Sequence, residues 1–346
     1  MLPSNLVEVR KNHKFDLNEF SKWIDYNQPS YGRIIEVKQF VGGQSNPTFV
    51  IFFSNNSSLI LRKKPPGELL PSAHAIEREY KVQKALEKTN FPCPNMIDIC
   101  EDNNVIGTPF YLMKIVEGRV FDSILDINDK QGRKDYYFDL VRILGKLHNI
   151  NFSSINLTDF GKIGNYINRQ IIRWEKQWHL SKQRELPIMQ NIIDWLNNNI
   201  PSYEETTIVH GDFRIGNTIC DYKSFNVKAV LDWELSTLGH PFADLGYFLY
   251  AHYVPFGERH GLKGANMKDL NIPTANDLVA EYCKVRKIKE FDPTFYIVLS
   301  LFRSISILEG VYARYVKGNE SSPNAKDIGK DVEPLAEATY NIIKKL

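Results

Sequence analysis

One stretch of the chain, residues 208–234, constrains its fold and chemistry most, and it reads IVHGDFRIGNTICDYKSFNVKAVLDWE. It places Asp212 after a His-Gly pair, Asn217 five residues later, and Asp232 at the end of an apolar run. The apolar residues around these side chains are typical of short strands, which we expect at 207–209, 218–220 and 227–231. The three polar groups therefore lie on a loop and at a strand end of a rigid scaffold, where binding and catalytic groups are commonly placed.

This set of side chains matches what phosphoryl transfer requires. One carboxylate, Asp212, accepts the proton of the attacking hydroxyl, while Asn217 and Asp232 hold Mg²⁺ on the phosphates of a nucleotide. A His-x-Asp followed by an Asn also arises by chance. The strand and the second aspartate at the expected distance are what make the pattern specific. We therefore expect a catalytic centre that uses ATP and Mg²⁺.

Length and composition indicate an ordinary globular protein of one large or two small domains. The chain has 346 residues, 43% hydrophobic and 24% charged, and its net charge of +2 gives no reason to expect nucleic acid binding.

Four cysteines without C-x-x-C spacing favour reduced thiols in a cytoplasmic protein. The N-terminus lacks the apolar core of a signal peptide. The longest apolar run, 295–302, is shorter than the ~20 residues that span a bilayer, so no membrane partner is expected. The oligomeric state is left open.

The N-terminal part predicts three strands, at residues 34–41, 48–53 and 58–62, with a glycine-rich loop between the first two. The loop reads GGQSNP, and its paired glycines let backbone N–H groups approach phosphate oxygens without interference from a Cβ atom. Two adjacent glycines more often form an ordinary turn, so the loop supports a nucleotide site only together with the residues that follow. The nucleotide contacts expected in the loop are Gly42, Gly43, Ser45 and Asn46.

The third strand ends in consecutive cations, in the segment LILRKK. A kinase needs one cation here to grip the α- and β-phosphates, held by a glutamate from a helix. Strand alternation places Arg62 and Lys63 on opposite faces, and we select Arg62, with Lys63 as the alternative. A helix expected within residues 73–88 supplies the partner Glu79, although Glu77 lies on the same helix.

A buried strand at 108–113 then leads into LMKIVEG, and residues 119–346 read as mostly helical. A strand followed by a short segment and a glycine suits a hinge whose backbone pairs with adenine. It is equally typical of an ordinary turn.

These features follow one another in the order of the protein-kinase-like fold: the glycine loop, the strand cation, the helix glutamate, the hinge, HGD-x4-N and the strand-end aspartate. The spellings HGD and DWE resemble the aminoglycoside phosphotransferase family rather than protein kinases. Longer strings resemble more closely the kinase-like domain found in acyl-CoA dehydrogenase family members ten and eleven, among them GGQSNPTF, GTPFYLMKIVEGRVF, VHGDFRIGN and VLDWELSTLGHPFADLGY.

The resemblance runs from about residue 34 to 330. It implies an α+β, protein-kinase-like two-lobe fold. The N-terminal nucleotide-binding lobe, 1–117, has an antiparallel sheet plus a helix, and the C-terminal catalytic and acceptor-binding lobe, 118–346, is mostly helical.

The resemblance also implies roles for single positions. His210 is similar to a structural histidine, Asp244 to a residue that accepts N–H bonds from the catalytic loop, and Arg214 is equally readable as a surface cation. The implied catalytic residues are Asp212 and Arg214, the implied Mg²⁺ ligands are Asn217 and Asp232, and the implied nucleotide contacts include Arg62, Glu79, Met113, Lys114 and Val116.

The implied reaction transfers the γ-phosphoryl group of ATP to a hydroxyl of a small molecule. Residues 251–346 hold 14 Lys and Arg against 12 Asp and Glu, so nothing there offers the acidic pocket that a polycationic aminoglycoside favours. An anionic acceptor is therefore expected. The arginines that are candidates to face it are Arg169, Arg173, Arg303 and Arg314.

By resemblance, a hydroxyacyl-CoA, such as a 4-hydroxy acid derivative, is the first choice of acceptor. The alternatives are an aminoglycoside or another small alcohol or sugar, and a nucleotide-binding module without turnover. The intact Asp212, Asn217 and Asp232 argue against the module. A protein kinase is disfavoured because the chain has no A-P-E motif, and its one D-F-G, at residues 159–161, precedes the His-Gly-Asp loop instead of following it. The preference for ATP or GTP is left open.

Overall fold

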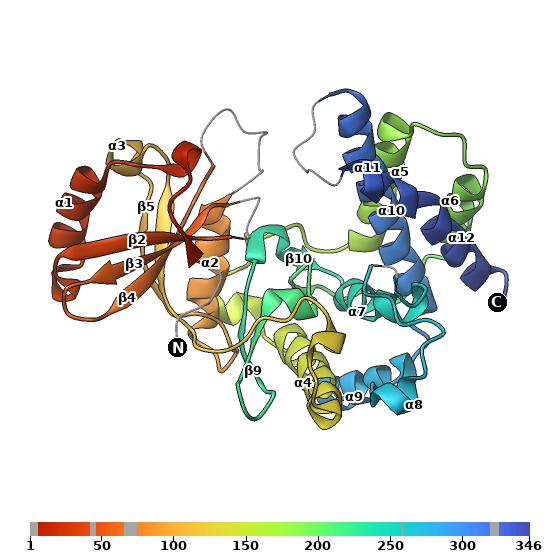
Figure 1. The fold of residues 1–346 in the computed structure, drawn as a ribbon. Coiled ribbons are helices and arrows are strands. Elements are labelled where there is room, and N and C mark those ends of the chain that lie inside the picture. Colours follow the sequence, from red (N-terminus) through yellow and green to blue (C-terminus); the bar gives the residue numbers. More distant parts are fainter. Residues whose placement is uncertain (1–5, 42–45, 66–74, 258, 319–324) are drawn as a thin grey trace.

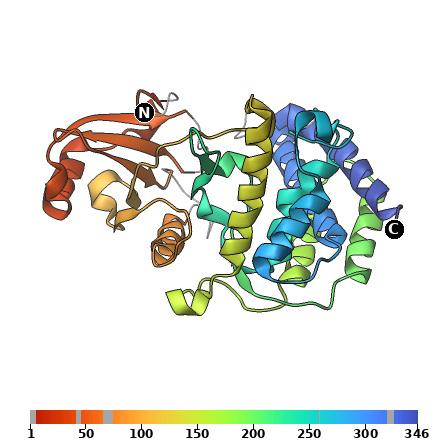
Figure 2. The same cartoon turned by 90° about the horizontal axis from the view of Figure 1, so that it is seen from below.

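The structure is a computed structural model that describes residues 6–41, 46–65, 75–257, 259–318 and 325–346. They form the two predicted lobes, a sheet lobe at the red-to-orange end of the chain and a mostly helical lobe from yellow to blue (Figure 1). Figure 2 shows the same division from below.

Six antiparallel strands form the sheet in the order β1-β2-β3-β4-β6-β5. Their bounds are Leu6–Val7 (β1), Ile34–Phe40 (β2), Thr48–Phe53 (β3), Ser58–Lys63 (β4), Met96–Cys100 (β5) and Phe110–Lys114 (β6). The three strands predicted at the N-terminal end match β2, β3 and β4 to within one residue. Their continuous apolar runs, such as TFVIFF, are explained by burial on both faces of the sheet.

Helices cover both faces of this sheet. On one face, Phe20 of α1 (Leu17–Asn27) packs with Phe49 and Leu61, and the short α3 (Asn103–Ile106) adds Ile106 to this cluster. On the other, Ile76 of α2 (Ile76–Leu86) packs with Met96 and Tyr111. Burying a side chain such as Phe20 contributes about 1.5–3 kcal/mol, which helps to hold α1 against the sheet.

The helical lobe also contains two small antiparallel sheets, β7 with β10 and β8 with β9. Their strands are Thr207–Val209 (β7), Thr218–Cys220 (β8), Val227–Val230 (β9) and Thr237–Gly239 (β10). The helices are Lys130–His148 (α4), Tyr166–Ser181 (α5), Ile188–Asn198 (α6), Pro241–Leu249 (α7), Met267–Leu270 (α8), Ala275–Arg286 (α9), Thr294–Val316 (α10), Ala325–Ile328 (α11) and Val332–Ile343 (α12). The strands predicted around the His-Gly-Asp loop therefore match β7, β8 and, to within one residue, β9.

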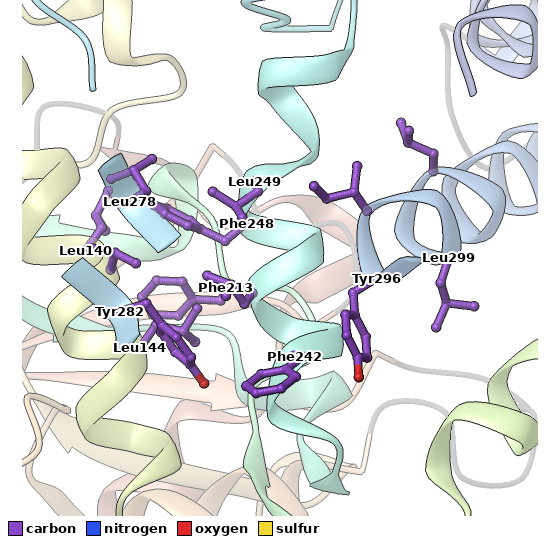
Figure 3. Close-up of a cluster of buried hydrophobic side chains, with 14 of the residues drawn as sticks. Leu140, Leu144, Phe213, Phe242, Phe248, Leu249, Leu278, Tyr282, Tyr296 and Leu299 are labelled. Atoms are coloured by element: carbon purple, nitrogen blue, oxygen red, sulfur yellow. The ribbon is translucent and has the colours of Figure 1, made fainter. Parts of the chain in front are cut away.

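The core of the helical lobe anchors the loop that follows β7. Phe213, next to Asp212, has no exposed surface and lies among Leu144 of α4, Phe248 of α7 and Tyr282 of α9 (Figure 3). The rings of Phe213 and Phe248 are 5.8 Å apart at their centroids. A large aromatic side chain buried one residue from the polar loop fixes the position of that loop on the core.

The long helix α10 has 23 residues and, by length and composition alone, could cross a membrane. It extends beyond the apolar run 295–302, which by itself is too short to do so. Within the fold, 72% of its most apolar window is buried. It packs against α5, α7 and α12, which is how a central core helix of a globular lobe is placed.

Candidate active site

The loop that carries Asp212 is pinned by backbone hydrogen bonds to a buried carboxylate. Asp244, on α7, accepts from the N–H groups of His210 (2.6 Å) and Gly211 (2.8 Å). Gly211 has φ +83°, and a Cβ atom there would lie 2.6 Å from the Leu235 carbonyl oxygen, so the turn requires glycine. His210 also bonds through Nε2 to the Leu231 carbonyl (2.8 Å), which matches the bracing role expected of it.

The neighbours of Asp244 stabilise its ionised carboxylate. Burial acts to raise the pKa of Asp244, but hydrogen bonding to His148 and to the loop N–H groups outweighs it and holds the pKa below its ordinary value. His148 is buried in turn and bonds Tyr282. The expected contact of Asp244 with the loop is thus confirmed, and His148 is part of the core.

Both oxygens of the Asp212 carboxylate are engaged. Oδ2 accepts from Asn217 Nδ2 at 2.7 Å and lies 3.5 Å from Arg214 Nε. Oδ1 accepts from the phenolic hydroxyl of Tyr247. The side chain is 23% exposed, so it is oriented by the protein and still reachable. A fixed, accessible carboxylate is suited to receive a proton from a bound hydroxyl.

Asp232 follows β9 in a left-handed backbone conformation with φ +62°. The preceding N–H, of Leu231, donates to the Asn217 carbonyl at 2.8 Å, which ties the two strand-end segments together. The Oδ1 atom of Asp232 lies 2.7 Å from a terminal nitrogen of Arg62, a residue of the sheet lobe. This ion pair joins the two lobes at the site.

The predicted pairing of Arg62 with Glu79 is confirmed. Arg62 Nε lies 2.8 Å from Glu79 Oε2, and the buried glutamate also accepts from Asn46 Nδ2 (2.7 Å) and the Tyr111 hydroxyl (3.0 Å). Burial acts to lower the pKa of Arg62, but the carboxylates of Glu79 and Asp232 outweigh it and raise the pKa above its ordinary value. The guanidinium is therefore permanently charged.

The two alternatives to this pair lie elsewhere. Lys63 is on the opposite face of β4, with its ammonium 5.9 Å from the Phe15 ring, and Glu77 pairs with Lys64. Strand alternation therefore gave the right register. Of the loop residues expected to contact the nucleotide, Gly42, Gly43 and Ser45 lie outside the described residues, and Asn46 is buried against Glu79.

Asn217 and Asp232 have the donor chemistry that Mg²⁺ prefers. Asn217 commits its amide nitrogen to Asp212, which leaves its Oδ1 atom as the one that could bind a metal, and Asp232 is 35% exposed. Within the described ranges, no three His, Cys, Asp or Glu side chains gather into a cage. Mg²⁺ is commonly held by one or two protein oxygens while substrate phosphates and water complete its coordination, and Asn217 and Asp232 could supply such oxygens.

The segment after β6 carries the chain from one lobe to the other. Met113 and Lys114 end β6, and the Lys114 N–H is bonded to the Asn95 carbonyl at 2.8 Å. Beyond Val116, a Cβ atom at Gly118 would lie 2.5 Å from the Cys220 carbonyl oxygen, so glycine lets the connection pass closely over β8. The segment has the place expected of a hinge, and its adenine contacts stay a prediction.

A pocket of about 540 Å³ opens beside Asp212 in the helical lobe. The charged side chains on its wall are Asp122, Asp212, Arg214, Arg259 and Arg303. Three permanent cations therefore face two carboxylates there.

Of the four arginines proposed to face the acceptor, one lines this pocket, Arg303. Arg169 instead donates to the carbonyls of Gly164 and Lys162, and Arg173 lies 5.0 Å from the ring of Trp174. Arg169 and Arg173 therefore do not face this pocket, and the Arg169 guanidinium is bound by backbone carbonyls instead. Arg314 is an exposed residue of α10 and does not line the pocket.

Tyr247 is a site residue that the sequence pattern did not indicate. It lies three residues after Asp244 on α7, and residues at this spacing share one helix face. That spacing was the available signal: a helix that braces the loop through Asp244 also presents Tyr247 to the same loop.

The site combines an arginine–glutamate pair of the sheet lobe with a His-Gly-Asp loop and a strand-end aspartate of the helical lobe. This combination defines a kinase-like phosphotransferase with a hydroxyl acceptor. Comparison with known proteins bears this out. The chain belongs to the phosphotransferase enzyme family, which it matches over residues 36–267.

Individual relatives are longer proteins. The chain is 42% identical over 315 residues to acyl-CoA dehydrogenase family member 10 of Mus musculus and 38% identical over 350 residues to family member 11 of Homo sapiens. These matches cover 90% and 99% of this chain but 29% and 45% of the relatives, so the chain spans less than half of their length. A crystal structure from Ralstonia eutropha, provisionally named an aminoglycoside phosphotransferase, superimposes with a TM-score of 0.87 at 38% identity, over 96% of this chain and 99% of that one.

Proposed function

We propose that this chain transfers the γ-phosphoryl group of ATP, with Mg²⁺, to the hydroxyl of an anionic small molecule, and that this molecule is a hydroxyacyl-CoA such as a 4-hydroxyacyl-CoA. The observation that carries the proposal is the position of Asp212. It is a carboxylate oriented by Asn217 and Tyr247 on the wall of a pocket that also presents three arginines.

Each residue of the site has one part in the proposed reaction. The acceptor oxygen forms a bond to the γ-phosphorus, the bond from that phosphorus to the bridging β–γ oxygen breaks, and ADP leaves. Asp212 orients the hydroxyl and takes its proton. Asn217 and Asp232 hold Mg²⁺, which neutralises charge on the phosphates when it is bound. Arg62, held by Glu79, grips the α- and β-phosphates.

The choice of a CoA thioester draws on two kinds of support. The relatives at 42% and 38% identity are named acyl-CoA dehydrogenases, so an acyl-CoA is a natural substrate class for a domain that accompanies them. The arginines of the pocket favour an acceptor that carries negative charge or carbonyl oxygens. A polycationic acceptor would meet a wall with three arginines against two aspartates there.

The name of the Ralstonia eutropha structure, at 38% identity, favours a second candidate, an aminoglycoside acceptor. A coupled assay of ADP release distinguishes the two. The purified chain is mixed with Mg²⁺ and ATP or GTP, and then with 3-, 4- and 5-hydroxyacyl-CoAs, ethanolamine or kanamycin in separate reactions. We expect ADP release to depend on a hydroxyacyl-CoA. Turnover of kanamycin with no turnover of any hydroxyacyl-CoA would replace the proposal by the second candidate.

A further inference from the structure

Arg303 of α10 stands out among the arginines of the pocket because no carboxylate pairs with it in the described part of the protein. Its guanidinium carbon lies 5.0 Å from the centroid of the Tyr247 ring and 5.7 Å from that of Trp174. Within the described part of the chain it forms neither a hydrogen bond nor an ion pair, and its Nε atom is buried without an acceptor. Two aromatic rings therefore hold the guanidinium in place while its donors stay unused.

The other arginines of the pocket are compensated. Arg214 lies 3.5 Å from Asp212, and Arg259 lies 3.2 Å from Asp331. A comparable stacked arginine away from the pocket, Arg184, lies over Tyr312 and is 3.2 Å from Glu309. A partly buried charge with no partner is unfavourable unless a ligand supplies one. The Arg303 guanidinium is thus placed to donate hydrogen bonds to an oxygen of a bound ligand.

The position of Arg303 relative to Asp212 indicates which oxygen this is. Tyr247 links the two residues, since its hydroxyl bonds the Asp212 carboxylate and its ring lies under the Arg303 guanidinium. An acceptor with its hydroxyl at Asp212 reaches Arg303 across the length of one tyrosine side chain. That span corresponds to a few bonds of an acyl chain, so the phosphates of a CoA lie farther away.

We propose that Arg303 binds the acyl carbonyl oxygen of the acceptor, and that it makes the enzyme select molecules with a hydroxyl and a carbonyl a few carbons apart. This inference rests on the proposed function and assigns a residue to its selectivity. Donation by a charged guanidinium to a carbonyl oxygen is worth about a 10- to 100-fold preference over an acceptor that lacks the oxygen.

Two acceptors test this directly. 4-Hydroxybutyryl-CoA carries the carbonyl, and 4-hydroxybutyl-CoA, a thioether, keeps the hydroxyl and the whole CoA but lacks that oxygen. For the native enzyme we expect kcat/KM to be about 10- to 100-fold higher with the thioester. In Arg303→Met the ratio of the two kcat/KM values should fall to about one, while the KM for ATP stays unchanged. Arg303→Lys, which keeps the charge without the planar fork, should retain part of the ratio.

Arg173→Met is the matched control. Arg173 is also a cation over the Trp174 ring, at 5.0 Å, but it does not line the pocket, so its loss should leave the ratio at the native value. The carbonyl assignment is overturned if Arg303→Met keeps the native ratio, or if Arg173→Met lowers it as much. These outcomes differ from failure of the proposed function, in which the native enzyme phosphorylates neither CoA derivative.

Discussion

The phenolic hydroxyl of Tyr247 donates a hydrogen bond to Oδ1 of Asp212, the carboxylate at the centre of the site. Burial, and then the Asp212 charge, raise the pKa of Tyr247 well above its ordinary value, so the phenol remains a donor throughout the physiological range. Since Asp244 on the same helix holds the loop backbone, α7 both positions the loop and orients its carboxylate. Tyr247 is thus a positioning residue whose effect on the reaction passes through Asp212.

Tyr247→Phe should lower kcat by about 10- to 100-fold, because the carboxylate loses one of the two hydrogen bonds that orient it. Nucleotide affinity should not change, since the phenol faces the acceptor pocket. Steady-state kinetics with the accepted hydroxyacyl-CoA, and titration with Mg·ADP, measure the two quantities.

Tyr250→Phe is the control for this substitution. Its ring is 5.2 Å from that of Tyr247 and lines the same pocket, but no hydrogen bond connects it to Asp212 among the described residues. Equal losses of kcat in the two variants would show that Tyr247 acts by packing and not through its hydroxyl.

Asp212→Ala should reduce phosphoryl transfer by about 10²- to 10⁴-fold while nucleotide binding is retained, because the carboxylate acts on the acceptor hydroxyl. Single-turnover transfer and Mg·ADP titration separate the two effects. Asp122→Asn removes another carboxylate from the pocket wall and should keep most of the activity. Near-native turnover by Asp212→Ala would assign the proton to another group.

Asp232→Ala should weaken nucleotide binding only when Mg²⁺ is present, because the metal links this carboxylate to the phosphates. Arg62 keeps its contact with Glu79 at 2.8 Å, so the sheet lobe should stay folded. Calorimetric titration of ADP with Mg²⁺ and with a chelator gives the comparison. An equal loss of affinity under both conditions would contradict a metal-binding role.

The sequence predicted the parts of this protein that depend on local pattern. Alternation on β4 gave the opposite faces of Arg62 and Lys63, and the apolar runs around Asp212 gave β7, β8 and β9. The strands and the opposite faces of Arg62 and Lys63 need only neighbouring residues, which is why they could be read directly. The pairing of Arg62 with Glu79 was expected from the kinase pattern, with Glu77 as an open alternative.

The parts it missed depend on contacts across the chain. Arg169 and Arg173 share a helix face, but the Arg169 guanidinium donates to the backbone carbonyls of residues 162 and 164. Nothing in the local sequence pattern reveals these hydrogen bonds. Arg303 reaches Tyr247 only because α10 packs on α7, and α1 is fixed by apolar side chains of the sheet. Such packing outweighs local preference and is set by the whole fold.

Glu79→Ala should lower the free energy of unfolding by about 3–5 kcal/mol, because it leaves Arg62, Asn46 and Tyr111 without their shared buried acceptor. Glu77→Ala on the same helix breaks only a surface pair with Lys64 and should cost about 0–1 kcal/mol. Urea unfolding measures both. A larger loss in Glu77→Ala would transfer the structural role to that residue.

Acid should destabilise the protein through His240, whose pKa burial lowers from 6.5 to about 4. Between these values the unfolded chain binds a proton that the folded chain does not. The free energy of unfolding therefore falls by about 1.4 kcal/mol per pH unit for this group as the pH drops below 6.5.

His240→Asn should remove that part of the pH dependence. Asparagine can still cap α7, where His240 accepts from the Phe242 N–H at 3.2 Å, so the variant should stay folded. Because His148 and His252, whose pKa values burial also lowers, are unchanged in it, the difference between the native and variant slopes isolates His240. If His240→Asn lost stability as steeply as the native protein between pH 6.5 and about 4, the proton would be taken up elsewhere in the fold.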